Sequence, residues 1–348
     1  MRQFRKKLTV TAAALALAVT ALTGCGNSDD AVVAEVGGEE ITLGVANFYA
    51  RMQQAQYETY YASMMGMTVD TMWTQEAGED ETMEDTTKER ILTDLENMYL
   101  LSQHAEEYEI SISEDDKKAI EKAAGIFDED NSLEDKEMVS GYTKNVQKIL
   151  ELMTIEVRMQ EAMTADVDTE VSDEEAAQKS MQYVLFSYTT TDESGNSVTL
   201  TDEEKEALKT TAQEFADNVN ADAAKDMDTA AANAGLEVQT ATFDSESVSP
   251  NEDLVAAVDA LENEGDIAGP VETESGIYVA KLTSLLDRAA TDTEKESIVE
   301  QRKQDQYDSL IEGWREKADI KVHEGVWKKV DFEDQGVTIT VSEEEYMD

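Results

Sequence analysis

The side chains that most often carry enzyme chemistry are scarce in this chain. Its 348 residues include two histidines and one cysteine. His104 and His323 lie far apart in the sequence, and Cys25 lies near the N-terminus. The chain therefore has very few residues that could form a histidine-assisted nucleophilic site. Neither a metal-binding His/Cys spacing nor a glycine-rich phosphate loop occurs in the sequence. We expect no cofactor and no bound metal.

The binding of apolar side chains is a second kind of chemistry that the sequence offers. A stretch between residues 57 and 83 is rich in methionine and aromatic residues: Tyr57, Tyr60, Tyr61, Met64, Met65, Met67, Met72, Trp73 and Met83. Methionine is flexible and accepts varied apolar partners. Two interpretations stay open. Either Met64, Met65 and Trp73 line a groove that binds unfolded chains, or these residues form contacts between packed helices.

The N-terminus is typical of an export signal. Four basic residues within residues 1–7 precede an apolar run over residues 8–22, which is shorter than the ~20 residues of a spanning helix. Leu22-Thr23-Gly24-Cys25 resembles the lipobox of bacterial lipoproteins, which implies cleavage before Cys25 and acylation of its sulfur. Two acyl chains hold a protein stably on a membrane. We predict a signal peptide over residues 1–24 and an extracytoplasmic, lipid-anchored location; an ordinary signal with a chance cysteine is the alternative.

The chain is strongly acidic, with a net charge of −50. Removal of the signal peptide leaves 24 basic against 78 acidic side chains, a net charge of −54. Such a charge repels nucleic acid and anionic lipid surfaces. A solvated, self-repelling surface explains this charge. Binding of calcium, or of basic segments of a partner polypeptide, is the more specific alternative. The nearest approach to a calcium loop, at residues 192–196, has its glycine in the wrong place.

Residues 25–177 are predicted to form a mainly helical domain. A hairpin of Val32–Val36 and Ile41–Leu43 leads into a helix over residues 45–65. Later helices are expected after a capping box at Thr86–Glu89, after Ser113 as a short helix, and over residues 133–163 with a weak point at Gly141. The hairpin-then-helix opening resembles the start of PrsA- and SurA-type extracytoplasmic foldases.

The end of the chain returns to helix at residues 291–317. Two strands are expected after it, over residues 318–322 and 326–330. Short strands at both ends of the mature chain suggest that the ends pair, so that residues 289–330 rejoin the N-terminal domain, as in PrsA-type foldases. Residues 331–348 are predicted to be an acidic tail.

Residues 178–288 are predicted to form a separate α/β domain inserted into the helical body. Tyr183–Phe186 is a strand, and Leu254–Leu261 is a short helix. An edge segment at residues 267–271 contains Pro270, and Ile277–Leu282 alternates like a strand. This order of helix, Gly-Asp-Ile-Ala-Gly-Pro-Val loop and final strand resembles the C-terminal half of parvulin-type peptidyl-prolyl isomerases. The resulting fold class is α+β.

The resemblance implies a site in the inserted domain. Tyr183 and Tyr278 fall where parvulins keep two histidines, Glu237 falls near the family's acidic or cysteine position, and Leu254 lies near the pocket aromatic. Two tyrosines on adjacent strands can still form a polar pair, because each hydroxyl donates and accepts hydrogen bonds. The alternative is that both are core or groove aromatics.

The sequence thus predicts a membrane-anchored foldase that binds unfolded or folding exported polypeptides. Its parvulin-like domain either keeps a weak isomerase activity or has lost it. A homodimer is left open, and nucleic acid is not an expected partner. A solute-binding lipoprotein of a transporter is the alternative, but it would need repeated strand-helix units in two lobes. A purely structural envelope protein is a third hypothesis.

Overall fold

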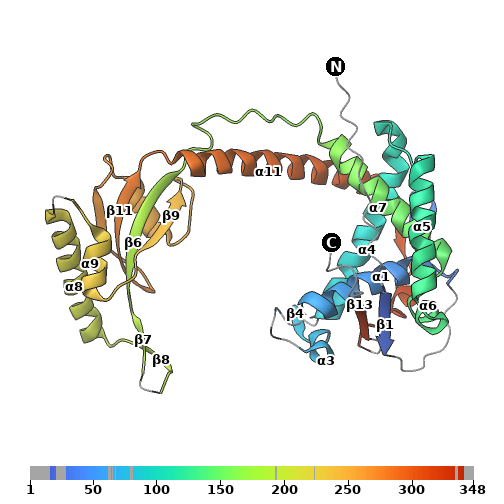
Figure 1. The fold of residues 1–348 in the computed structure, drawn as a ribbon, viewed down its shortest axis with the longest axis horizontal. Helices are drawn as coiled ribbons and strands as arrows, with labels where there is room; N and C mark the ends of the chain where they lie inside the picture. The colour runs from blue at the N-terminus through green and yellow to red at the C-terminus, as the bar shows by residue number, and fades with distance from the viewer. Residues whose placement is uncertain are drawn as a thin grey trace. The chain divides into compact units, whose positions relative to one another are not determined.

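The computed structural model describes residues 16–20, 29–61, 64, 66, 68–78, 81–192, 194–222, 224–333 and 336–340. The chain divides into two compact units (Figure 1). Unit 1 comprises Met1–Asp166 and Gln304–Asp348, and unit 2 comprises Val167–Lys303. Helices and sheets occur in both units, which confirms the α+β class. Every strand pair of the described residues is antiparallel, so these residues do not form the parallel strand-helix lobes of a solute-binding protein.

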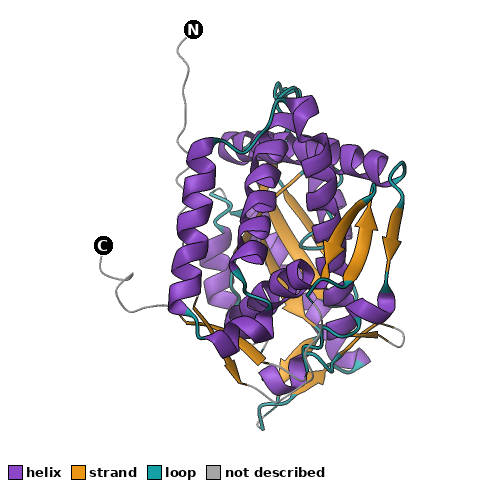
Figure 2. Cartoon of the chain, turned by 90° about the vertical axis from the view of Figure 1, so that its right-hand side faces the viewer, coloured by secondary structure: helices purple, strands orange, loops and turns teal. Residues whose placement is uncertain are grey.

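Unit 1 is built mainly from helices, which pack side by side in Figure 2. They are α1 (Leu43–Gln56), the π-helical turn η1 (Tyr57–Tyr61), α3 (Val69–Met72), α4 (Met83–His104), the 3-10 turn η2 (Ala105–Tyr108), α5 (Glu114–Asp130), α6 (Leu133–Val139), α7 (Thr143–Met163) and α12 (Glu324–Trp327). The long helix α11 (Arg288–Arg315) crosses the boundary between the units. Large, fully buried side chains from α1, α4 and α7 form the core, among them Leu43, Leu95, Tyr99 and Ile149.

The helix boundaries follow local capping chemistry. The Ser113 hydroxyl accepts from the Asp116 amide at the start of α5, and the Asp116 carboxylate accepts from the Ser113 amide. A helix does begin after Ser113 as predicted, but with 17 residues it is not the short helix that was expected. The expected weak point at Gly141 is confirmed, because α6 ends at Val139 and α7 begins at Thr143. The capping box expected at Thr86 is wrong: Thr82 and Asp85 form it one turn earlier, so Thr86 is already inside α4.

A three-stranded sheet joins the two ends of unit 1. β2 (Val32–Val36) pairs with β3 (Glu39–Thr42) on one side and with β12 (Ile320–Val322) on the other. The predicted pairing of the chain's end strands is therefore confirmed, with Ile320 opposite Val36. The strand expected at residues 326–330 is wrong. That segment begins with helix α12, in which the amides of Val326 and Trp327 donate to the His323 carbonyl oxygen.

The C-terminal segment differs from the predicted acidic tail. Phe332 and Val337 are buried in the core of unit 1, and β13 (Gly336–Thr340) pairs with β1 (Ala16–Thr20). The two apolar side chains decide the outcome, because burying each of them stabilises the fold by about 1.5–3 kcal/mol whatever the charge of their neighbours. Unit 1 also contains a two-stranded ribbon of β4 (Glu76–Gly78) and β5 (Glu81–Thr82).

Unit 2 is a four-stranded antiparallel sheet between helices (Figure 1). The strand order is β10 (Ile267–Glu272), β11 (Gly276–Ser284), β6 (Lys179–Ser187) and β9 (Gln239–Phe243). Helices α8 (Asp202–Ala221) and α9 (Met227–Ala234) pack on one face, and α10 (Glu252–Asp259) packs on the other. A small hairpin joins β7 (Thr189–Thr191) to β8 (Ser197–Thr199).

The predicted edge strand is confirmed. β10 lies at the edge of the sheet, and its pairing with β11 shifts register between Ala268 and Val271, where Pro270 has no ladder donor to contribute. Gly269 has a φ of +102°, and an added Cβ there would lie 2.6 Å from the carbonyl oxygen of Tyr278. The close approach of the two strands beside Tyr278 therefore requires glycine.

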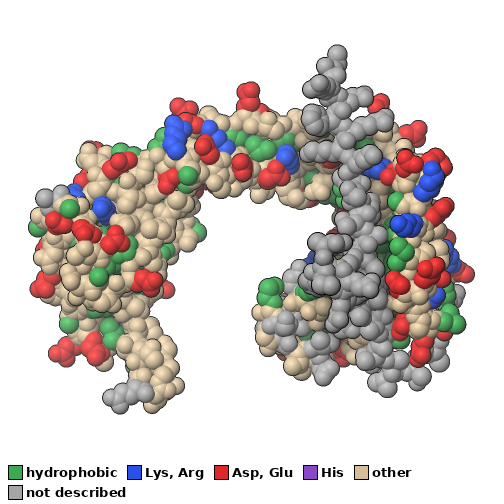
Figure 3. Space-filling model, viewed as in Figure 1, with side chains coloured by type: hydrophobic (Ala, Val, Ile, Leu, Met, Phe, Trp, Pro, Cys, Tyr) green, Lys and Arg blue, Asp and Glu red, His purple; other side chains and the backbone are tan. Residues whose placement is uncertain are grey.

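On the face drawn in Figure 3, the acidic side chains of the described residues are spread out rather than gathered in one place. Several form exposed ion pairs or cap helices, such as Asp173 with Lys295 and Glu204 with Thr201. Within the part of the chain that the structure describes, no helix is long and apolar enough to cross a membrane.

Candidate functional site

The two tyrosines predicted for the inserted domain meet on one face of the sheet of unit 2. Tyr183 lies on β6 opposite Ala280, and Tyr278 lies on β11 opposite Leu185. These diagonal positions on neighbouring strands bring aromatic rings within reach of each other. The ring centroids are 5.9 Å apart with an interplanar angle of 56°. The structure therefore brings the two residues together, as the sequence predicted.

The rings are buried while their hydroxyls reach the surface. Tyr183 is 8% exposed and Tyr278 is 6% exposed. Neither hydroxyl has a hydrogen-bond partner among the described residues, and no fully buried side-chain oxygen or nitrogen of those residues lacks one. The hydroxyl tips must therefore contact solvent, where each remains free to donate and accept. Burial, and to a lesser degree the neighbouring Tyr278 phenol, raise the pKa of Tyr183, so its hydroxyl stays protonated at neutral pH.

Glu237 is not brought into this pair. It is exposed and precedes the first residue of β9, Gln239. The residue of β9 directly opposite Tyr183 is Gln239, which shares its face of the sheet. Sequence reasoning missed Gln239, although counting in twos back from the buried Phe243 gives the same face.

Leu254 lies in the core beneath the tyrosines. It is fully buried on α10, in a cluster that includes Tyr183, Tyr278, Val255, Val258 and Phe243. Because its side chain does not reach the surface, Leu254 can support the rings but cannot contact a bound chain directly. The site of unit 2 is thus a pair of phenol hydroxyls and an exposed amide above an apolar floor.

The methionine-rich stretch of unit 1 is divided between core and surface. Trp73 is 2% exposed, and its indole N–H donates to Glu58 at 2.9 Å while its ring packs against Phe332. Met64 is 73% exposed. The interpretation as packing contacts therefore holds for Trp73, whereas Met64 remains available to a partner. Met65 and Cys25 lie outside the described residues.

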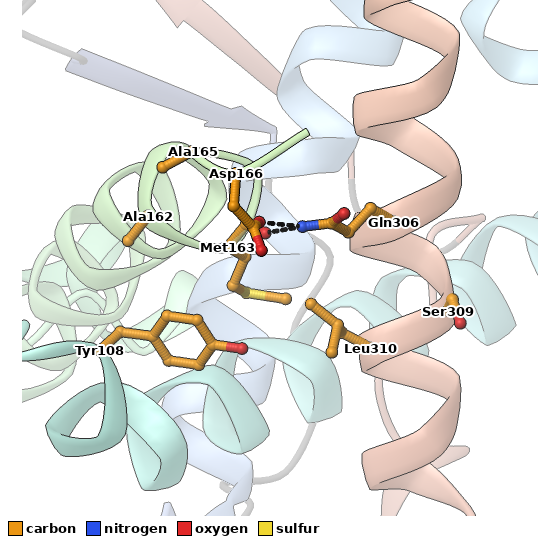
Figure 4. Close-up of a pocket in the computed structure, with 8 residues that line it drawn as sticks. All are labelled: Tyr108, Ala162, Met163, Ala165, Asp166, Gln306, Ser309 and Leu310. Atoms are coloured by element: carbon orange, nitrogen blue, oxygen red, sulfur yellow. Dashed lines mark hydrogen bonds between the residues drawn. The ribbon is translucent and has the colours of Figure 1, made fainter. Parts of the chain in front are cut away.

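A cavity in unit 1 was not expected from the sequence. It has a volume of about 570 Å³ and lies between the end of α7, the turn η2 and α11 (Figure 4). Its wall is both apolar and polar: Tyr108, Ala162, Met163, Ala165, Asp166, Gln306, Ser309 and Leu310. Gln306 donates to the Asp166 carboxylate and to the Met163 carbonyl oxygen, both at 2.6 Å. No sequence motif marks this cavity, because its residues come from three separate segments.

Each of the two histidines lies beside a carboxylate of unit 1. His104 stacks on Trp314 with ring centroids 4.1 Å apart and lies 2.8 Å from a carboxylate oxygen of Glu107. His323 lies 3.5 Å from a carboxylate oxygen of Glu35. Across the described ranges, no group of three or more His, Cys, Asp or Glu side chains could hold a metal ion.

The chain thus combines a helical unit, whose cavity has apolar and polar walls, with an inserted antiparallel sheet unit that carries a tyrosine pair. Residues 1–140 match the family model described as the SurA-like N-terminal domain. This match agrees with the SurA-type relationship expected from the hairpin-then-helix opening.

Solved structures of foldases are distantly similar. A structure of SurA-like chaperones, PEB4 and Cj1289 of Campylobacter jejuni, matches at 12% identity and a TM-score of 0.29, covering 84% of this chain and 99% of that one. The foldase PrsA of Lactococcus lactis matches at 14% identity and 0.31, with 86% and 97% covered. PrsA of Streptococcus pneumoniae matches at 16% and 0.28, with 74% and 96% covered. No curated protein matches the chain.

Proposed function

We propose that this protein is a lipid-anchored, extracytoplasmic foldase that binds exported polypeptides while they fold. The observation that carries the proposal is the SurA-like N-terminal domain over residues 1–140. In the structure this domain is part of unit 1, together with the C-terminal segment Gln304–Asp348. Foldase activity in such a unit depends on reversible contacts with apolar side chains of partly folded clients.

Unit 1 offers a surface suited to such contacts. The cavity beside α11 has apolar walls from Tyr108, Met163 and Leu310, and a polar rim from Asp166 and Gln306 (Figure 4). Methionine adapts to side chains of different shape, and a polar rim lets the same cavity stay hydrated when empty. We therefore assign client side-chain binding to this cavity, with the exposed Met64 as a second contact.

Unit 2 is proposed to be a parvulin-like domain in which tyrosines replace imidazoles. Rotation about an X-Pro bond crosses a barrier of about 18–20 kcal/mol. A catalyst must hold the twisted amide more tightly than the planar one. Tyr183, Tyr278 and Gln239 offer polar groups to such an amide, but a neutral phenol does not exchange protons near pH 7 as imidazole does. We expect low turnover of X-Pro bonds, with client binding as the main activity.

Membrane anchoring is proposed through Cys25. Its place after Leu22-Thr23-Gly24 supports acylation of the sulfur. Replacing Cys25 by Ser should abolish the incorporation of labelled fatty acid into the protein by the producing cell. Equal fatty-acid labelling of the Cys25→Ser protein and the unmodified chain would contradict the anchor.

Two assays on the mature chain test the proposed activities separately. Light scattering of a urea-unfolded exported enzyme on dilution measures client protection, and a protease-coupled proline-peptide assay measures isomerisation. We expect suppression of aggregation at near-equimolar protein and little acceleration of isomerisation. Failure in both assays would remove the foldase proposal. Fast isomerisation would instead contradict the reduced role assigned to the tyrosines.

A further inference from the structure

β13 is fixed to unit 1 along one edge by side chains of the turn η1. The Val337 amide donates to a carboxylate oxygen of Glu58 at 2.6 Å, and the Ile339 amide donates to the Thr59 hydroxyl at 3.1 Å. Val337 is fully buried in the core. The strand is therefore held in an extended shape by unit 1 itself.

The segment before β13 is held in the same way, through its backbone. The Phe332 amide donates to Glu84 at 3.0 Å. Arg51 donates to the Asp331 carbonyl oxygen at 2.8 Å, and Gln54 donates to the Phe332 carbonyl oxygen at 3.2 Å. These bonds do not involve β1, so β13 should keep its position without β1.

The other edge of β13 carries a different partner. Successive residues of a strand turn their amides to opposite edges. The amides of Val337 and Ile339 point to η1. The amides of Gly336, Thr338 and Thr340 must therefore point to the opposite edge, where β1 pairs with β13. Within the described residues this sheet contains only these two strands. The paired segment is Ala16–Thr20, which lies inside the proposed signal peptide.

We propose that removal of the signal peptide opens the outer edge of β13 as a strand-addition site for an extended, uncharged or basic segment of an exported polypeptide. This inference rests on the proposed function and adds the mode by which a client is held. The segment Ala16–Thr20 shows the chemistry that fits, since it pairs in antiparallel register and carries no charge. The net charge of −54 of the mature chain disfavours acidic segments. Backbone pairing tolerates many sequences, as a foldase with varied clients needs.

The test compares the precursor sequence with a processed chain that begins at residue 25, both carrying Cys25→Ser. The probe is a fluorescein-labelled peptide of residues 14–22 with lysines added at both ends. Its control has N-methyl groups on alternate residues, which removes backbone donors and keeps charge and side chains. Fluorescence anisotropy should show saturable binding to the processed chain. We expect binding at least about tenfold weaker for the precursor and for the N-methylated peptide, because several edge hydrogen bonds are lost.

A variant in β13 tests the same edge from the protein side. Thr338→Pro removes one outward amide, and Thr338→Val keeps it. Peptide binding should fall about tenfold for proline and stay unchanged for valine, with equal thermal midpoints for the two variants. If Thr338→Pro also lowers the thermal midpoint, its weaker binding could come from unfolding. The comparison of the unmethylated and N-methylated peptides on the unmodified chain then tests whether backbone pairing is needed.

Several outcomes would overturn the inference. Equal binding to precursor and processed chain, or equal binding of the two peptides, would contradict edge pairing. A processed chain that dimerises through Thr338 in light scattering would assign the edge to a second copy instead. If no peptide binds while client aggregation is still suppressed, the foldase proposal stands and the strand-addition site fails.

Discussion

At the scale of single residues, the tyrosine pair divides into a structural part and a polar part. The rings of Tyr183 and Tyr278 fill the apolar face of the sheet, whereas their hydroxyls contact solvent. Replacing either residue by Phe should change the free energy of unfolding by less than about 0.5 kcal/mol, because no buried partner is lost. Replacement by Ala should cost about 3–5 kcal/mol through the cavity that it leaves. Urea denaturation of the four variants checks both values, and a large cost for Phe would show that the hydroxyls are structural.

Glu58 provides a contrasting case, since its carboxylate is buried and both of its oxygens accept hydrogen bonds. It is 6% exposed and accepts from Gln54, Trp73 and Val337. Glu58→Ala would leave buried N–H groups without an acceptor, at about 1–3 kcal/mol for each unsatisfied group. We expect a loss of about 2–4 kcal/mol in the free energy of unfolding and faster amide hydrogen exchange over residues 336–340. Unchanged exchange in that segment would mean that β13 is held by other contacts.

At the scale of elements, α4 and α7 place two carboxyl groups near each other inside unit 1. Burial raises the pKa of Asp94, and burial together with the charge of Asp94 raises the pKa of Glu156. Both groups are therefore costlier to ionise in the folded chain than in the unfolded chain, where a Glu pKa is about 4.3. This cost is fully present above the folded-state pKa and disappears as the pH falls toward the unfolded value.

Glu156→Gln should therefore stabilise the protein at pH 8 and leave its stability unchanged near pH 4. The measurement is the thermal midpoint of the variant and of the unmodified chain across this pH range. Glu161→Gln, on an exposed position of the same helix, is the matched control and should show no such trend. A gain that persists at pH 4 would show that the charge of Glu156 is not the cause.

The edge strand β10 depends on one glycine. A Cβ at Gly269 would lie 2.6 Å from the Tyr278 carbonyl oxygen, and the φ of +102° is strained for any other residue. Gly269→Ala should lower the free energy of unfolding by about 2–3 kcal/mol. Gly313→Ala is the control, because no atom lies within 4 Å of its added Cβ on α11; it should stabilise by about 0.5–1 kcal/mol. Equal effects of the two changes in urea denaturation would contradict this explanation.

At the scale of the whole molecule, local sequence patterns predicted single helices and strands better than features that are built from distant segments of the chain. The strand alternation of Ile277–Leu282 and the helix start expected after Ser113 correspond to observed elements. The β2–β12 pairing also followed from strands at the two chain ends. The strand and the helix start depend on residues that are close in sequence. The β2–β12 pairing is the one expected from the PrsA-type family that the sequence resembles.

The sequence did not reveal features assembled from distant segments. The cavity joins Tyr108, Met163 and Leu310, which no spacing links. Phe332 and Val337 lie in an acidic stretch, and their burial depends on partners such as Glu58 and Glu84, more than 240 residues away. Composition describes the average of a segment, whereas burial is decided by single side chains and the contacts that tertiary structure gives them.

If folding exported polypeptides bind to unit 1, site-specific photo-crosslinking at its cavity should capture them. A photoreactive phenylalanine analogue replaces Ser309 at the cavity rim in one variant and Val198, an exposed apolar residue of the β7–β8 hairpin, in another. Each variant is mixed with a urea-unfolded exported enzyme during dilution. We expect crosslinks to the unfolded client from position 309 that disappear once the client is folded, and few from position 198. Crosslinks from position 198 alone, or none from position 309 with any unfolded client, would contradict client binding by unit 1.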